Sequence, residues 1–232
     1  MTEDENIYRN GTYLKLNKGW GRCDSEWEVE QVLKLMCRNN IKVKNIADVG
    51  CGVGKVAKTL SSKLSHLKID CYDISPQLSL FWKKIKRENI CFFLKDFLKS
   101  RKSYDLILLV NVIEHLDDYR GYLRKIRDRS KYKILHIPLD LSMQMLLRES
   151  RLIGMRKEVG HIHYFSKNIA LALLEELGYE VIDYFYTPSS IELKPSSVMM
   201  TILKPIRKIF FLINKDLTVK LLGGYSLIVL MK

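Results

Sequence analysis

Hydrophobic positions along the chain alternate between the spacing of a helix and the spacing of a strand. Val29, Val32, Leu33 and Met36 recur at helical spacing within residues 26–39, which predicts a helix with Asp24 or Ser25 as its N-cap. Later apolar runs are short and are followed by turn residues, as strands are. The pattern predicts strands at 45–49, 68–75, 90–96, 104–110, 131–138, 179–187 and 225–232, and helices at 76–87, 119–129, 166–178 and over Val56, Leu60 and Leu64.

Strands and helices that alternate in this way indicate an α/β fold with a doubly wound, mostly parallel sheet. The run 104–110 is apolar throughout, which is typical of a strand buried on both faces. The last strand, 225–232, interrupts the alternation, so it either extends the edge of the sheet or inserts between two neighbours.

Two connections are too long for ordinary loops of a compact sheet, residues 139–165 and 188–222. We interpret both as helical lid insertions that cover a substrate. This divides the chain into an N-terminal cap segment and helix (1–40), a core (41–187 and 223–232) and the two lids. Within the second lid, Val198–Ile213 mixes apolar and basic residues and contains Pro205, which predicts a broken or kinked helix that either packs on the sheet or contacts a membrane surface.

Composition and charge narrow the class of protein. The 232 residues, 47% hydrophobic and 28% charged, fit one large globular domain rather than a disordered chain. The net charge of +13 is spread along the chain and leaves a nucleic-acid partner open. Five cysteines without a CxxC pair indicate neither a disulfide framework nor a cysteine zinc site, and the acidic start has no signal-peptide pattern, so we expect a cytoplasmic protein.

The strongest local motif follows the first predicted strand, where Asp48 precedes Gly50, Gly52 and Gly54. Glycines at a strand-to-helix turn allow a ligand to approach the backbone and allow positive φ. The spacing does not satisfy the dinucleotide motif G-x-G-x-x-G, and Lys55 lacks the flanking residues of a Walker A loop. A tight turn without a ligand remains an alternative for this motif alone.

Carboxylates also end the next two strands, with Asp73 after the second and Asp96, followed by Phe97, after the third. Each alone could be a helix cap or turn residue. Three such positions on successive strands are better explained by one ligand that lies across the switch point of the sheet, with Asp73 accepting hydrogen bonds from a ribose diol.

Together these residues resemble the class I S-adenosylmethionine-dependent methyltransferases, over about residues 40–187 and 223–232. Residues 104–116 resemble the fourth strand of that family and its following loop, and 223–230 resemble its antiparallel last strand. Cys71 and Lys95 depart from the family pattern, where glycine is common, and affect loop shape more than ligand chemistry. The resemblance implies a Rossmann-like seven-stranded fold, S-adenosylmethionine as cofactor, and the small-molecule, quinone-biosynthesis-like branch. The cofactor-binding residues that it implies are Asp48, Gly50, Cys51, Gly52, Gly54, Asp73, Ile74, Asp96, Phe97 and Asn111.

Histidines are the candidates for a base or a contact to the methyl acceptor. His115 follows the fourth strand, and His161 and His163 would project to one side of an extended segment. The latter pair could ligate a metal, but the spacing shows no third ligand, so we expect none. His136 lies within a strand and suggests a structural role. Tyr13 and Trp20 precede the first helix, where the family often folds a segment over the methionine end of the cofactor.

The sequence therefore predicts methyl transfer to oxygen, nitrogen or carbon of a small molecule or biosynthetic intermediate. An RNA methyltransferase is the first alternative, because of the net charge of +13. A cofactor-binding protein without catalysis is the second. A nicotinamide-binding protein is disfavoured by Lys55.

Overall fold

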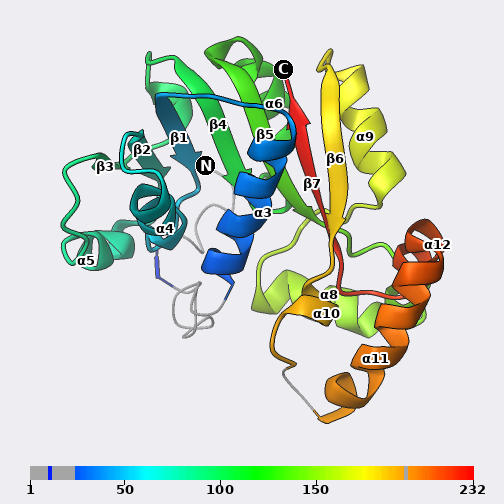
Figure 1. The fold of residues 1–232 in the computed structure, drawn as a ribbon. Helices are drawn as coiled ribbons and strands as arrows, with labels where there is room; N and C mark the ends of the chain where they lie inside the picture. The colour runs from blue at the N-terminus through cyan, green and yellow to red at the C-terminus, as the bar shows by residue number, and fades with distance from the viewer. Residues whose placement is uncertain (1–9, 12–23, 196–197) are drawn as a thin grey trace.

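A computed structural model describes residues 10–11, 24–195 and 198–232. Its centre is a seven-stranded sheet in the order β3-β2-β1-β4-β5-β7-β6 (Figure 1). The strands are β1 (Asn45–Val49), β2 (Lys68–Asp73), β3 (Ile90–Leu94), β4 (Tyr104–Val110), β5 (Ser130–Pro138), β6 (Val181–Thr187) and β7 (Ser226–Met231). β7 inserts between β5 and β6 and is antiparallel to both, whereas the other pairs are parallel. The predicted doubly wound α/β fold with an antiparallel last strand is confirmed.

Helices cover both faces of the sheet (Figure 1). On one face, apolar residues of α3 (Ser25–Arg38), α4 (Lys55–Lys63) and α5 (Ser79–Trp82) pack against β1, β2 and β4. On the other face, α6 (Tyr119–Ile126) and α9 (Lys167–Glu176) pack in a second apolar cluster. Because the central strands bury side chains on both faces, they read as continuous apolar runs in the sequence.

The helix predicted over residues 76–87 is wrong in length. A 3₁₀ turn (Pro76–Leu78) and the single turn α5 replace it. Only Leu78 and Trp82 of this segment are buried, while Leu80 is 65% exposed, so the apolar face is too small to support a longer helix. Four basic residues follow within 83–87 and repel one another across one helical turn.

Both insertions are helical. The first holds α7 (Met143–Leu146) and α8 (Glu149–Glu158), and the second holds α10 (Ser189–Glu192), α11 (Val198–Ile213) and α12 (Lys215–Leu221). α11 continues through Pro205, so the predicted break does not occur there. Within the described ranges, no helix combines the length and the hydropathy that crossing a bilayer requires. Tyr13 and Trp20 lie outside the described residues, and the division into core and lids stays a prediction.

The sheet order reverses between β1 and β4, which both leave their carboxyl ends at one edge. Their following loops diverge to opposite sides at such a switch point and leave a crevice, where ligands of open α/β sheets bind. The loop after β1 carries Gly50, Gly52 and Gly54, with φ of 70°, 54° and 80°. The fold therefore places the glycine motif at the crevice.

Candidate active site

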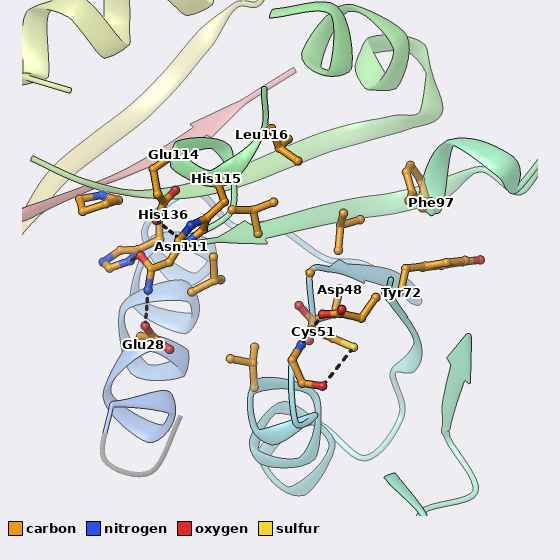
Figure 2. Close-up of a pocket in the computed structure, with 18 of the residues that line it drawn as sticks. Glu28, Asp48, Cys51, Tyr72, Phe97, Asn111, Glu114, His115, Leu116 and His136 are labelled. Atoms are coloured by element: carbon orange, nitrogen blue, oxygen red, sulfur yellow. Dashed lines mark hydrogen bonds and ion pairs between the residues drawn. The ribbon is translucent and has the colours of Figure 1, made fainter. Parts of the chain in front are cut away.

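A cavity of about 1150 Å³ occupies this crevice. Its walls come from the loops after β1, β2, β3 and β4, from the start of α3 and from both insertions. Figure 2 shows the side chains of Asp48, Cys51, Asn111, His115 and Glu114 around it. The predicted site residues that line the cavity are Asp48, Gly50, Cys51, Gly52, Asp73, Ile74, Asp96, Phe97, Asn111, His115 and His161. Gly54 and His163 are absent from its lining.

The glycine loop is held against the neighbouring strand by its own backbone. The amides of Gly50 and Cys51 both donate to the carbonyl oxygen of Tyr72, at 2.8 and 3.2 Å. A Cβ on Gly50 would lie 2.7 Å from Cγ2 of Val112, so only glycine lets the loop pass this close. Gly54 instead is the N-cap of α4, and a Cβ there would lie 2.7 Å from the ring of Phe92. Gly54 therefore allows the loop to pack closely against Phe92, and it does not line the cavity.

Asp73 joins two of the loops that form the cavity. Its Oδ2 accepts a hydrogen bond from the amide of Gly52 at 3.0 Å, and its Oδ1 accepts one from the amide of Ser75 at 3.0 Å. Burial is the largest influence on this carboxyl and raises its pKa, against these hydrogen bonds. Asp73 also lines the cavity, so a role in the turn and contact with a ligand are compatible in this residue.

The pair Asp96 and Phe97 lies at the end of β3. Asp96 caps the following 3₁₀ turn by accepting from the amide of Leu98 at 2.9 Å. The ring of Phe97 is only 1% exposed, because it packs edge-on against Tyr72 and below the guanidinium of Arg129. Phe97 therefore borders the cavity as part of the core and does not offer it an open aromatic face.

The cavity is acidic, although the chain carries a net charge of +13. Buried Asp48 has an Oδ2 without a hydrogen-bond partner among the described residues, and burial together with Asp73 and Glu28 raises its pKa to about 7. Burial and Asp24 likewise raise the pKa of Glu28 to about 7. A site built this way favours a cationic ligand. Eight acids line it (Asp24, Glu28, Asp48, Asp73, Asp96, Glu114, Asp117 and Asp118), against three lysines (Lys55, Lys95 and Lys125).

A hydrogen-bonded chain crosses the floor of the cavity. The side-chain amide of Asn111 donates to Glu28 at 2.7 Å, and its oxygen lies 2.8 Å from Nδ1 of His136. The amide oxygen of Asn111 can only accept, so Nδ1 of His136 carries the proton. Nε2 of His136 then accepts from the hydroxyl of Thr187 at 2.8 Å. His136 is structural, as expected, yet it also lines the cavity. Sequence reasoning missed Glu28, because its place in the site depends on how α3 crosses the sheet.

At the other end of the cavity, the 3₁₀ turn Ile113–His115 meets the loop before α9. The carbonyl oxygen of Glu114 accepts from the amides of Ile162 and His163, at 2.9 and 3.1 Å. The rings of His115 and His161 lie 5.0 Å apart, and burial lowers the pKa of His115 to about 4. Hence the structure brings two of the three predicted histidines together.

His163 points elsewhere. Its ring packs edge-on against Tyr119, with centroids 4.6 Å apart. The prediction that His161 and His163 share one side required an extended segment, but these residues form no strand and follow Gly160, whose φ is 77°. Glu114 takes the place beside His161 instead. Its signal in the sequence was its position directly before His115, in the turn that follows a buried strand.

Comparison with known proteins gives the family. A family model described as a methyltransferase domain matches residues 25–184, more than half of the chain. No curated protein sequence matches the chain.

Solved structures share the fold at low identity. Magnesium protoporphyrin IX methyltransferase from Synechocystis with bound S-adenosylmethionine superposes with a TM-score of 0.64 and 14% identity, over 100% of this chain and 97% of that one. A plantazolicin methyltransferase gives 0.62 and 14%, over 94% and 87%. Coclaurine N-methyltransferase gives 0.60 and 16%, over 88% and 72%.

The fold, the glycine loop at the switch point and the family match agree with one another. The quinone-biosynthesis-like branch stays a prediction. The chain belongs to the methyltransferase-domain family, and it is a class I S-adenosylmethionine-dependent methyltransferase.

Proposed function

We propose that the chain transfers a methyl group from S-adenosylmethionine to oxygen, nitrogen or carbon of a small-molecule acceptor inside the cavity. The observation that carries the proposal is the continuous cavity of about 1150 Å³, lined by acids at the switch point. Pockets for one drug-sized ligand span roughly 300–1,000 Å³, so this cavity has room for a donor and a small acceptor together.

The described residues fit the cofactor. S-adenosylmethionine carries an ammonium group and a sulfonium, and Asp48 offers a buried carboxylate oxygen that lacks a partner among the described residues. Gly50 and Gly52 both line the cavity, and Gly50 is exposed there, whereas the backbone of Gly52 is buried and bonded to Asp73 and Trp82. We assign Asp48 to the amine, Gly50–Gly52 and the carbonyl of Asn111 to the methionine part, and Asp73 to the ribose. Ile74, Asp96 and the amide after it would border the adenine.

When bound, the cofactor supplies an electrophilic methyl group on a positively charged sulfur. The protein's own task is to align the acceptor with that methyl group and to keep water away. His115 and His161 lie where an acceptor would enter beside Asn111, so they are our candidates for contacting it. We place His163 outside the catalytic set, since its ring faces Tyr119.

The lining charge favours a small acceptor over RNA. Burial keeps Glu114 neutral and leaves Asp48 and Glu28 partly protonated near pH 7, but the remaining acids still outnumber the three lysines. Such a lining would repel phosphates, whereas nucleic-acid sites concentrate cations. The net charge of +13 therefore lies elsewhere on the surface. A turnover assay distinguishes an enzyme from a binding protein without catalysis. We expect the protein to convert S-adenosylmethionine into S-adenosylhomocysteine when a small-molecule extract is added as the source of acceptor, and not when RNA is added.

Replacing Asp73 tests the cofactor site. We expect Asp73→Ala to weaken the binding of S-adenosylhomocysteine by roughly 1–3 kcal/mol, because a ribose diol loses its acceptor. Calorimetric titration measures this, with NADH as the control ligand and thermal unfolding as the check that the loops still hold. Unchanged affinity in a folded variant would show that Asp73 only accepts the hydrogen bonds from Gly52 and Ser75 and does not contact the ligand.

A further inference from the structure

Three groups that commonly bind metals converge at the acceptor end of the cavity. One ligand atom each from Glu114, His115 and His161 lie within 4.8 Å of one another. Nε2 of His115 is 3.8 Å from Oε1 of Glu114, close to the spacing of two ligands that share one ion. All three residues line the cavity, so an ion among them would be open to a ligand from that side.

The carboxylate of Glu114 is the unusual member of this cluster. Its side chain is 0% exposed, and neither of its oxygens accepts a hydrogen bond from any described residue. A buried carboxylate without such bonds is costly unless it binds a cation or a proton. Burial raises the pKa of Glu114, so the carboxyl holds a proton in the free protein, and a cation that enters the cavity would take the place of that proton.

Both imidazoles are held in the orientation that metal ligands require. Nδ1 of His115 lies 2.9 Å from the carbonyl oxygen of Gly160, which can only accept, so this nitrogen carries the proton. Nδ1 of His161 lies 2.8 Å from the carboxylate of Asp140. Nε2 of His115 lies 3.8 Å from Oε1 of Glu114, and one ligand atom of His161 lies within 4.8 Å of both residues. A carbonyl or carboxylate behind the ring is the usual support of a metal-binding histidine.

From this arrangement we propose that Glu114, His115 and His161 bind a divalent first-row transition metal ion. One carboxylate and two imidazoles suit Zn²⁺, Fe²⁺ or Co²⁺ better than Mg²⁺ or Ca²⁺, which prefer oxygen ligands. Three protein ligands leave positions open toward the cavity, as in catalytic sites. Asp140 acts as a positioning residue for His161.

Such an ion would select acceptors that carry oxygen, and this part of the inference rests on the proposed function. An acceptor hydroxyl bound to the ion loses its proton to solvent more easily. The oxygen electron pair then forms the O–CH₃ bond while the S–CH₃ bond breaks, which converts the sulfonium into a neutral thioether. The acceptor class is therefore a hydroxylated or phenolic small molecule.

Metal titration of untagged protein tests the site. We expect one Co²⁺ per chain, with the visible absorption of a protein-bound ion, and displacement by Zn²⁺. Glu114→Gln and His161→Gln should weaken Zn²⁺ binding at least about tenfold, and Asp140→Asn roughly tenfold, while exposed His66→Gln should leave it unchanged. Absence of saturable binding, or equal affinity in folded Glu114→Gln, would overturn the site.

A parallel titration with S-adenosylhomocysteine separates the two proposals. Cofactor binding without metal binding would refute the metal site and leave the proposed function standing. Metal binding without cofactor binding would refute the proposed function and leave the metal site standing.

A second observation concerns α11, whose apolar stripe faces away from the protein. Val198, Ile202, Ile206, Ile209 and Ile213 follow one another at helical spacing and are all exposed, Ile213 by 76%. A helix of a globular protein normally turns this stripe toward the core. Figure 1 shows α11 at the periphery, away from the sheet. Further exposed apolar side chains lie on α7, α8 and α12 and directly after α7, at Met143, Leu146, Leu147, Ile153, Leu217 and Leu221.

The charge around the exposed stripe of α11 indicates the kind of partner that would cover it. Residues 198–221 include five basic residues and one acid, Asp216, which accepts hydrogen bonds from Lys167 and Tyr186. Exposed Lys208, Lys215 and Lys220 flank the stripe. A second copy of the chain would bring the same positive charge against itself in a symmetric contact. We infer that the exposed stripe of α11 docks on a membrane surface with anionic lipid headgroups.

Vesicle co-sedimentation tests the docking surface. We expect binding to phosphatidylglycerol vesicles, much weaker binding to phosphatidylcholine vesicles, and a loss of about tenfold or more in Ile202→Glu/Ile209→Glu. Leu80→Glu, equally exposed but on α5, is the matched control and should bind as the wild type does. Equal binding by the double variant, no binding by the wild type, or a dimer that the double variant disrupts would each overturn the inference.

Discussion

Asp48→Asn is expected to lower the affinity for S-adenosylhomocysteine by about 1.5–3 kcal/mol, roughly ten- to hundredfold. The variant keeps the size of the side chain but removes the charge that would pair with the ligand's ammonium group. Because Asp48 is buried, no water replaces the lost partner. Calorimetric titration at pH 8, where wild-type Asp48 is ionised, gives the largest difference.

The same residue predicts how binding depends on pH. With a pKa of about 7 in the free protein, Asp48 holds a proton on part of the molecules at neutrality. A bound cation favours the ionised form, so binding releases protons near pH 7, and affinity falls as the pH drops below 7. Glu28 titrates in the same range, so Asp48→Asn should reduce proton release without abolishing it.

Asp105→Asn is the matched control for this substitution. Asp105 is partly buried, less deeply than Asp48, and accepts from the amides of Lys44 and Asn45, but it lies at the opposite end of its strand. It should lower stability and leave cofactor affinity unchanged. Equal affinity of Asp48→Asn and wild type at pH 8 would reduce Asp48 to a structural residue.

The parts of the fold that could be predicted are those fixed by local periodicity. Residues 104–110 are apolar throughout because β4 is buried on both faces, and this pattern needs no knowledge of its neighbours. The segment 76–87 lacked such a constraint: its apolar residues are spaced as in a helix, but nothing in the sequence shows that Leu80 stays exposed. The place of β7 between β5 and β6 was likewise one of two alternatives, because pairing is a long-range property.

The site residues likewise fall into those that the sequence pattern predicts and those that only the packing of distant segments brings to the cavity. Asp48, Gly50 and Asp73 end predicted strands, and the carboxyl ends of parallel strands meet at one edge. Glu28 reaches Asn111 across 83 residues of sequence, which only the packing of α3 determines. His161 and Glu114 meet because backbone hydrogen bonds place one loop on the other, and the spacing of two histidines in the sequence contains no such information.

Gly50→Ala is expected to destabilise the fold by about 1–3 kcal/mol, and to weaken cofactor binding as well. The φ of 70° is strained for any residue with a Cβ, and the added atom would lie 2.7 Å from the side chain of Val112. The loop or Val112 must then shift, and both line the cavity, so the surface that meets the ligand would change. Urea unfolding measures the first effect, and calorimetric titration with S-adenosylhomocysteine measures the second.

The same chemical change at Gly154 should have the opposite sign. Gly154 lies within α8, where a Cβ would contact only Oε1 of Glu158 at 3.7 Å, so Gly154→Ala should stabilise by about 0.5–1 kcal/mol. Gly50→Ala/Val112→Ala should recover part of the loss, because it relieves the contact but not the strain in φ. If Gly50→Ala were as stable as the wild type and bound the cofactor equally well, the loop would not need glycine at this position, and the proposed backbone contact to the methionine part would fall with it.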